Sequence, residues 1–186
     1  LEAVRHFEGP ALVLAGAGSG KTRVLTSRVG YLITNHHVDP RQILLLTFTK
    51  KAADEMKARL ATLPGLSWHM SKYILTGTYH SIFLQILRGQ GDRRKIIGSE
   101  KHRHTILKII MKELNLQDAY EPETLLSLLS HYKNRMIEVR NIPDNSSIQK
   151  EIKTILQMYE QRKAETNCMD FDDILLDSYK LLKSNT

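Results

Sequence analysis

The sequence has one cysteine, five prolines and no apolar run long enough to cross a membrane. Because Cys168 stands alone, an internal disulfide and a cysteine-based metal cluster are excluded, and we expect a small, partly buried side chain there. The longest apolar runs, such as residues 43–46, fall far short of the roughly 20 residues that span a bilayer. No signal-peptide pattern opens the chain. We therefore expect a cytoplasmic protein with no membrane partner.

Acidic residues are fewer than basic ones, so the formal net charge is +7 and the pI is about 9.5. The cations are dense between residues 86 and 115, where either a solvated basic face or a nucleic-acid contact would explain them. The histidines lack the helical spacing that places two metal ligands on one face. We interpret His36, His37, His102 and His104 as surface residues rather than ligands.

A glycine-rich stretch follows the apolar run Ala11-Leu12-Val13-Leu14 and leads into residues typical of a helix. Its sequence is Ala15-Gly16-Ala17-Gly18-Ser19-Gly20-Lys21-Thr22. Glycines permit positive φ values and bring backbone N–H groups close to a phosphate chain at a helix N-terminus. We expect Lys21 to reach the β- and γ-phosphates and the Thr22 hydroxyl to hold Mg²⁺. A flexible glycine loop that ends in Lys-Thr by chance is the alternative.

The first half of the chain alternates strand and helix patterns. We predict strands at residues 11–14, 42–48 and 73–78, and helices at residues 21–33 and 49–63. The nearly continuous apolar run at residues 42–48 predicts a central parallel strand buried on both faces. On the second helix, the core stripe is expected at Ala52, Met56, Leu60 and Leu63. The order indicates an α/β fold, a doubly wound parallel sheet with right-handed crossovers.

From about Ser81 onward the pattern predicts helices only. Apolar residues repeat at helical spacing in three stretches, which we assign to the core: Ile106, Leu107, Ile110 and Leu114; Leu125, Leu128 and Leu129; Ile148, Ile152, Ile155, Leu156 and Tyr159. Pro122 and Asp144 are expected near helix starts. This change in composition predicts an inserted all-α subdomain.

The acidic run Asp170-Phe171-Asp172-Asp173 invites a Mg²⁺ assignment, because carboxylates near a phosphate loop hold that ion. However, no buried apolar strand precedes it, and the residues that follow are typical of a helix. We therefore interpret Asp170 as an N-cap, with acidic residues in the first helical turn.

Four ordered stretches together resemble the UvrD/Rep/PcrA family of superfamily 1 DNA helicases, over nearly the whole chain. They are the phosphate loop 15–22, residues 46–56, residues 77–81 and residues 170–173. The resemblance implies a RecA-like P-loop NTPase with an inserted helical subdomain. It implies an N-terminal part of the ATP-binding lobe at 1–85, the helical insertion at 86–167 and a return helix at 168–186.

The resemblance also implies site residues. ATP and Mg²⁺ would be the cofactors, with Lys21 and Thr22 catalytic, Thr22 the metal ligand and Arg23 beside the base. The nucleotide-binding set would be Ala15, Gly16, Ala17, Gly18, Ser19, Gly20, Lys21, Thr22 and Arg23. Single-stranded DNA would contact Thr47, Phe48, Thr49, Lys50, Lys51, Thr78, Tyr79 and His80. The aromatic rings suit bases and the hydroxyls and cations suit phosphates. The less favoured alternative is that Phe48 and Tyr79 are core aromatics.

By this resemblance the chain is the N-terminal part of an ATP-dependent DNA helicase or translocase, of a type that serves DNA repair. The family's adenine-reading glutamine would precede Leu1, and its Asp-Glu strand and second lobe would follow Thr186, acting in cis. We therefore expect the chain alone to be inactive. Duplex DNA at a fork is a further expected partner. A non-catalytic nucleotide- and DNA-binding module is the alternative, whereas a small-molecule kinase is disfavoured because no acceptor site follows the third strand.

Overall fold

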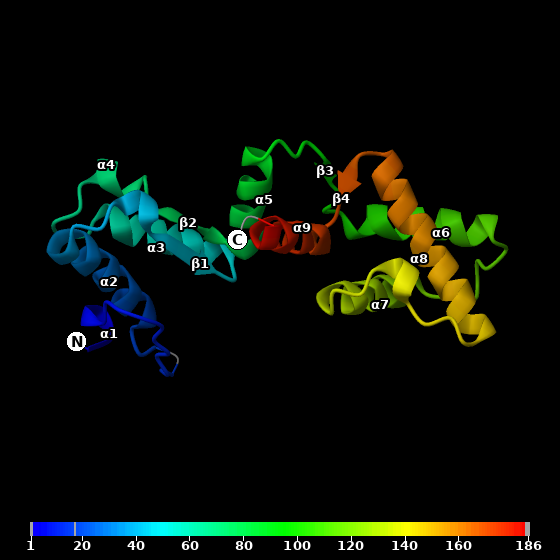
Figure 1. Cartoon of the computed structure of the whole chain (residues 1–186), viewed down its shortest axis with the longest axis horizontal. Helices are drawn as coiled ribbons and strands as arrows, with labels where there is room; N and C mark the ends of the chain where they lie inside the picture. Colours follow the sequence, from blue (N-terminus) through cyan, green and yellow to red (C-terminus); the bar gives the residue numbers. More distant parts are fainter. Residues whose placement is uncertain (1, 17, 185–186) are drawn as a thin grey trace. The chain divides into compact units, whose positions relative to one another are not determined.

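The computed structural model describes residues 2–16 and 18–184. The chain divides into two compact units, which we call the N-terminal unit (Leu1–Ile82) and the C-terminal unit (Phe83–Thr186). Figure 1 shows the helices and strands of both. Along the parts of the chain that the structure describes, no helix is both long enough and apolar enough to span a bilayer.

The N-terminal unit contains a small parallel sheet. Strand β1 (Leu44–Thr47) pairs with β2 (Leu75–Thr78), with Leu44 opposite Leu75 and Thr47 opposite Thr78. Helix α3 (Lys50–Ala61) and the short helix α4 (Trp68–Ser71) form the connection between them. A parallel pair requires such a crossover. The predicted strand–helix–strand order is therefore confirmed for these two strands, and the chain is an α/β protein.

Two further helices precede this sheet in the chain. They are α1 (Glu2–Arg5) and α2 (Lys21–His36), and a 3₁₀ turn, η1 (Pro40–Gln42), leads into β1. The core of the unit consists of buried aliphatic residues from α2, α3 and the strand flanks: Val29, Ile33, Ile43, Leu60, Leu66 and Ile74. On α3 the buried positions are Ala53, Met56 and Leu60, so the predicted stripe was one residue off at Ala52.

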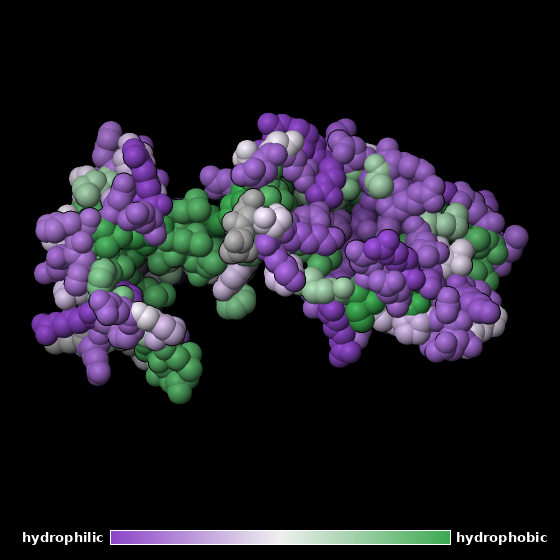
Figure 2. Space-filling view, viewed as in Figure 1, coloured by the Kyte–Doolittle hydropathy of each residue, from purple (hydrophilic) through white to green (hydrophobic). Residues whose placement is uncertain are grey.

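Two sequence predictions fail in this unit. Residues 11–14 form no strand and are exposed, with Leu12 86% exposed, and Figure 2 shows hydrophobic surface on this part of the unit. A strand is stable only when a neighbour completes its hydrogen-bonded ladder, and none of the described residues pairs with this run. Strand β1 is likewise not buried on both faces, because β2 is its sole sheet neighbour among the described residues and Leu44 is exposed.

The C-terminal unit is mainly helical. Helices α6 (Glu100–Glu113), α7 (Pro122–Asn134) and α8 (Ser147–Glu165) surround one core, and a 3₁₀ turn, η2 (Val139–Asn141), joins the last two. The fully or almost fully buried residues of this core are Leu107, Ile110, Met111, Leu125, Leu129, Ile142, Ile155, Leu156 and Tyr159. The predicted helical stripes and the helix start at Pro122 are confirmed, except at Ile148, which is exposed.

Helix α8 starts differently from the prediction. Its N-cap is Ser146, whose hydroxyl accepts a hydrogen bond from Gln149 N while the Gln149 side chain accepts one from Ser146 N. This reciprocal capping box satisfies two backbone donors at once. Asp144 instead pairs with Lys153, with Nζ and Oδ2 3.0 Å apart.

The prediction of helices alone after Ser81 is also wrong in one detail. Strand β3 (Lys95–Ile96) pairs in parallel with β4 (Cys168–Met169). The two strands are too short to show an alternating pattern, so no sequence period marks them. Helices α5 (Tyr79–Gly89) and α9 (Phe171–Ser184) contribute to a second core cluster in this unit around Leu87, Met169 and Ile174.

Candidate nucleotide and nucleic-acid site

The glycine-rich loop reaches α2 through left-handed backbone. Gly18 has φ 75° and Gly20 has φ 82°, and a Cβ at either position would be strained. The loop thus uses the positive φ that glycine permits at Gly18 and Gly20, but not at Gly16. Ala17 lies outside the described residues.

The Lys21 side chain folds back over the loop. Its Nζ donates to the carbonyl oxygens of Ala15, at 3.0 Å, and Gly16, at 2.5 Å. The Ser19 hydroxyl donates to the same Gly16 oxygen at 2.7 Å. Because both acceptors are neutral carbonyls, a phosphate oxygen would be a stronger partner for this ammonium.

The N-terminus of α2 is open to an anion. Gly20 is the N-cap and has no side chain to accept a hydrogen bond from the first turn, which contains no acidic residue. Unpaired N–H groups at a helix start attract negative charge. Thr22, half-buried, and Arg23, exposed, lie in this first turn.

A pair of aromatic rings lies where the two strands of the sheet end. Phe48 follows β1 and is 92% exposed, and Tyr79 follows β2 and is 38% exposed. Their ring centroids are 5.7 Å apart with an interplanar angle of 43°. Carboxyl ends of parallel strands meet at one edge, and this edge presents the two rings together. Phe48 is not a core residue, which removes the alternative for that side chain.

The polar residues at this edge divide into two groups. The hydroxyl of Thr47 is buried and donates to Thr49 O at 3.0 Å. Thr49 and Thr78 accept hydrogen bonds from the backbone N–H groups of Ala52 and Ser81, so both cap helices. The remaining members of the predicted set are Lys50 and Lys51, both exposed, and His80, half-buried. The structure thus brings all eight predicted residues to one edge.

Gly77 is a residue of this edge whose importance a motif alone does not explain. A Cβ built there would lie 2.6 Å from Ser81 Oγ and 2.9 Å from Ile82 Cδ1. A larger residue there would force the Ser81 and Ile82 side chains at the start of α5 to move. Such a packing requirement has no sequence signal beyond the glycine itself.

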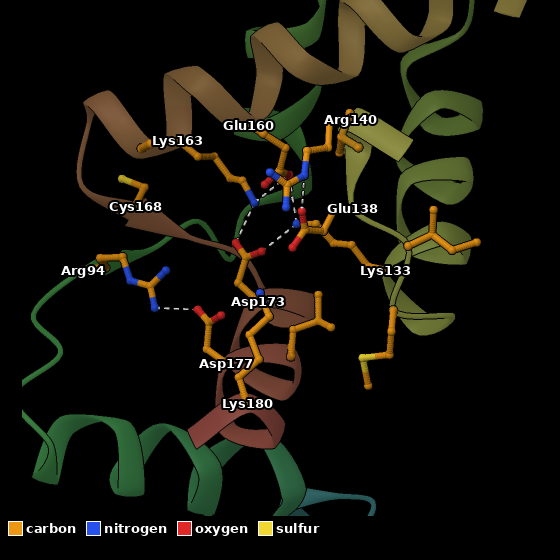
Figure 3. A pocket seen from close by; sticks show the side chains of 15 residues that line it. Arg94, Lys133, Glu138, Arg140, Glu160, Lys163, Cys168, Asp173, Asp177 and Lys180 are labelled. Carbon is orange, nitrogen blue, oxygen red and sulfur yellow. Dashed lines mark hydrogen bonds and ion pairs between the residues drawn. The ribbon is translucent and has the colours of Figure 1, made fainter. Parts of the chain in front are cut away.

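The C-terminal unit contains a charged pocket of about 650 Å³, drawn in Figure 3. Lys133 of α7 and Lys163 of α8 reach into it and are almost completely buried. Lys163 Nζ lies 2.7 Å from Asp170 Oδ2 and 2.5 Å from Asp173 Oδ2, and Lys133 Nζ lies 2.6 Å from Asp173 Oδ1. Glu160 Oε1 lies 2.9 Å from both ammonium groups.

The three carboxylates of this network are close enough to bind a metal ion together. However, the two lysine ammonium groups already take the place that a cation would fill. Burial alone would raise the pKa of Asp170, but Lys133 and Lys163 outweigh it and hold this pKa well below its usual range. Burial likewise opposes the charge on Lys133, and Glu160, Asp170 and Asp173 raise its pKa nevertheless. The network is a structural ion cluster.

Asp170 caps α9, as the sequence predicted. Its Oδ1 accepts a hydrogen bond from Asp173 N at 3.0 Å, and Asp173 Oδ2 accepts one from Asp170 N at 2.9 Å. The buried lysine partners were not predicted. A signal existed, because Lys133 continues the Leu125–Leu129 stripe and Lys163 continues the Ile155–Tyr159 stripe at a spacing of four residues.

Part of the basic run at residues 86–115 is also paired internally. Arg94 Nη2 lies 2.6 Å from both Asp92 Oδ2 and Asp177 Oδ2, and Arg88 lies 3.5 Å from Asp92. The hydrogen bond from Arg94 lowers the pKa of Asp92 despite partial burial. These two arginines stabilise the fold and leave fewer cations in this run for an external partner.

Comparison with known proteins places the chain in a family. The UvrD/REP helicase N-terminal domain matches residues 1–186. The chain is 36% identical to the ATP-dependent DNA helicase PcrA of Leuconostoc citreum, over 98% of this chain and 25% of the relative. It is 37% identical to the putative ATP-dependent DNA helicase YjcD of Bacillus subtilis, over 97% of this chain and 24% of the relative.

The chain thus spans about a quarter of the length of these curated relatives. A third relative, PcrA of Staphylococcus epidermidis, is 35% identical over 98% of this chain and 26% of its own length. Since the family match covers every residue, this chain belongs to the UvrD/REP helicase N-terminal domain family.

Proposed function

We propose that this chain is the ATP- and single-strand-binding N-terminal part of an ATP-dependent DNA helicase or translocase. The observation that carries the proposal is the combination of two sites in one unit. An uncapped helix start with Lys21 folded over a glycine loop suits a nucleotide, and the exposed Phe48–Tyr79 pair suits bases. The relatives' names describe ATP-dependent DNA helicases, which agrees with this combination.

For the fold, we propose a RecA-like P-loop lobe with an inserted helical subdomain. The lobe would begin at residues 1–85, the insertion would occupy 86–167, and residues 168–186 would return toward the lobe. The parallel β1–β2 pair with its α3 crossover and the helical core of α6, α7 and α8 support this organisation.

The loop residues fit a nucleoside triphosphate with Mg²⁺. A Cβ at Gly16, Gly18 or Gly20 would meet no atom within 4 Å, so there is open space beside each of these three glycines. The Thr22 hydroxyl is a hard oxygen ligand in the first turn of α2, and Mg²⁺ commonly takes one or two protein oxygens together with phosphates and water. The bound ATP–Mg²⁺ would supply the phosphoryl group whose transfer to water releases energy.

In this mechanism each protein group has a simple task. The Lys21 ammonium would exchange the Ala15 and Gly16 carbonyls for phosphate oxygens and stabilise negative charge on them. Thr22 would hold the ion, and the loop with Ala15, Ser19 and Gly20 would hold the phosphates. Arg23, exposed in the first turn of α2, would flank the base.

At the strand ends, bases would stack on Phe48 and Tyr79 and phosphates would approach Lys50, Lys51 and His80. Stacking tolerates any sequence and contributes roughly 1–3 kcal/mol per base. A motor that moves along DNA needs such sequence-independent contacts. Thr47, Thr49 and Thr78 fix the backbone that presents them.

The remaining partners follow from the same proposal. Duplex DNA at a fork would contact the cations of the basic run that lack a carboxylate partner, Lys101, Lys108 and Lys112 among them. Further lobes would act in cis, since the relatives are about four times as long as this chain. We place the whole protein in the cytoplasm and in DNA repair.

The decisive experiment measures ATP hydrolysis by a protein extended to the length of these relatives. We expect hydrolysis to increase when single-stranded DNA is added and to be lost in Lys21→Ala. ATP binding and oligonucleotide binding without hydrolysis would favour a non-catalytic module instead. Undiminished hydrolysis in Lys21→Ala would contradict the proposal.

A separate measurement tests the strand contact in the chain itself. The paired change Phe48→Ala with Tyr79→Ala should weaken binding of a labelled oligothymidylate, because two stacking surfaces are lost. Tyr179→Ala, which removes an exposed ring from the C-terminal unit, is the matched control. Equal binding by both variants would show that the strand does not lie on Phe48 and Tyr79.

A further inference from the structure

A second group of exposed aromatic rings lies in the N-terminal unit, away from the Phe48–Tyr79 pair. Trp68 is 56% exposed and Tyr73 is 50% exposed. Each ring is covered by a cation: Lys72 Nζ lies 3.3 Å from the centroid of Trp68, and Arg41 Cζ lies 4.7 Å from the centroid of Tyr73. The two pairs are adjacent, because Lys72 and Tyr73 are consecutive residues. We call these four side chains the Trp68–Tyr73 surface.

The Trp68–Tyr73 surface lies at the opposite end of the sheet from Phe48 and Tyr79. Arg41 belongs to η1, which precedes β1, and Tyr73 precedes β2 by two residues. Because β1 and β2 are parallel, both positions are at the amino ends of the strands. Four strand residues separate the two ends by about 13 Å.

A rigid turn presents these rings. Ser67 caps α4 by accepting a hydrogen bond from Met70 N at 3.2 Å, and Met70 O accepts one from Tyr73 N at 3.1 Å. Met70 and Ile74 pack into the core of the unit. The polar and aromatic residues between and beside these anchors are therefore directed outward by fixed backbone.

The chain that forms this surface carries little negative charge. The sequence contains no Asp or Glu from residue 56 to residue 91. Asp39 is the nearest acid to Arg41 in the chain, and its carboxylate accepts a hydrogen bond from Arg41 N at 2.9 Å. Beside Trp68 in the chain lie the polar residues Ser67 and His69, and the His69 ring centroid is 5.6 Å from that of Trp68.

We infer that the Trp68–Tyr73 surface is a second stacking contact for single-stranded DNA. Exposed rings beside cations are a combination that binds single strands, with bases on the rings and phosphates on Lys72 and Arg41. A protein partner would instead require a largely apolar centre around the aromatic anchors. This inference rests on the proposed function, because it assigns the same class of ligand to the opposite end of the sheet.

Trp68 is the only tryptophan of the chain, so its fluorescence reports on this surface directly. The experiment titrates the chain with a 15-residue oligothymidylate in low salt. We expect quenching of Trp68 emission that saturates with binding, persists in Phe48→Ala with Tyr79→Ala, and is reversed by salt. Unchanged emission at saturation would overturn the inference.

Affinity gives a second readout that does not need the fluorophore. With a labelled oligothymidylate, the double variant Trp68→Ala with Tyr73→Ala should bind at least fivefold more weakly than the unmodified chain. Tyr179→Ala, whose ring is also paired with a lysine, is the matched control and should bind normally. Since both changed rings are half exposed, thermal unfolding should be unaltered and shows that the variant is folded.

The outcomes separate this inference from the proposed function. A loss confined to the Phe48 and Tyr79 variant would overturn the second contact and leave the first in place. A loss of DNA binding confined to the Trp68 and Tyr73 variant would overturn the contact at Phe48 and Tyr79 and leave the second contact in place. Equal quenching by polyglutamate would overturn the nucleic-acid assignment, because it would show a surface that responds to negative charge alone.

Discussion

The two units of this protein differ in their net charge and in how their charged side chains are paired. Residues 1–82 contain ten Lys and Arg and five Asp and Glu, a formal charge of +5, whereas residues 83–186 contain seventeen and fifteen, a charge of +2. Every ion pair found among residues 2–16 and 18–184 lies in the C-terminal unit, and its buried cluster combines Lys133 and Lys163 with three carboxylates.

This contrast indicates a division of tasks. The N-terminal unit leaves cations and aromatic rings at its surface, where an anionic ligand would complete them. The C-terminal unit pairs many of its charges internally, and the cluster around Lys133 and Lys163 fixes the relative positions of α7, α8 and α9. Exposed cations without a carboxylate partner are thus the feature by which we propose the N-terminal unit as the one that binds single-stranded DNA.

The largest effect is expected from the buried cluster. Lys163→Met should destabilise the C-terminal unit by about 3–5 kcal/mol, because it leaves buried carboxylates without a compensating charge. Denaturant unfolding followed by circular dichroism measures this loss. Lys153→Met, which removes a cation paired with the exposed Asp144, is the control and should unfold at nearly the original midpoint. Similar unfolding midpoints for the two variants would show that the buried cluster is not essential for the stability of the C-terminal unit.

The pH dependence should show the same contrast. Because the pKa of Asp170 is lowered in the folded protein, its stabilising effect is complete above the unfolded value of about 3.9 and is lost as pH falls through the folded value. The raised pKa of Lys133 gives stability that is complete below about 10.4 and declines at higher pH. The free energy of unfolding, measured from pH 2 to 11, should therefore show a broad plateau. Asp170→Asn should remove the decrease in this free energy at acid pH.

Salt should separate the exposed cations from the paired ones. Lys50→Gln with Lys51→Gln should reduce the dependence of log affinity for single-stranded DNA on log salt by about 1.4, since each lost phosphate contact removes about 0.7. Arg162→Gln loses a cation already paired with Glu113 and should leave the slope unchanged. Binding titrations at four salt concentrations supply both slopes. A reduced slope for Arg162→Gln would show that a cation paired within the C-terminal unit also contacts phosphates, which contradicts the distinction between exposed and paired cations.

The smallest effect comes from two matched helix caps. Thr49→Ala and Ser146→Ala each remove a side-chain cap and should cost about 1 kcal/mol of stability. Only Thr49→Ala should also weaken DNA binding, because Thr49 lies beside Phe48. Thermal unfolding and oligonucleotide titration of both variants test this. Weaker binding of single-stranded DNA by Ser146→Ala would contradict a single-strand contact confined to the N-terminal unit.

Much of the candidate site could be predicted because its signals are local. Gly18 and Gly20 indicate left-handed backbone. Thr49 and Asp170 indicate helix starts, and the spacing of leucines indicates which face of a helix is buried. The predictions failed where burial depends on a neighbour. Residues 11–14 are apolar enough for a strand, yet no described strand pairs with them. Leu44 has β2 as its one described strand neighbour and remains exposed.

The sequence by itself determined the glycine loop before α2, the parallel strand–helix–strand order and the aromatic residues after the strands. Each follows from the chemistry of adjacent residues. Only the tertiary structure decided that Phe48 is exposed beside Tyr79 and that Lys133 and Lys163 are buried against Asp170. The reason is that exposure and charge pairing depend on which distant segments meet, and residues 133, 163 and 170 meet only when three helices pack together.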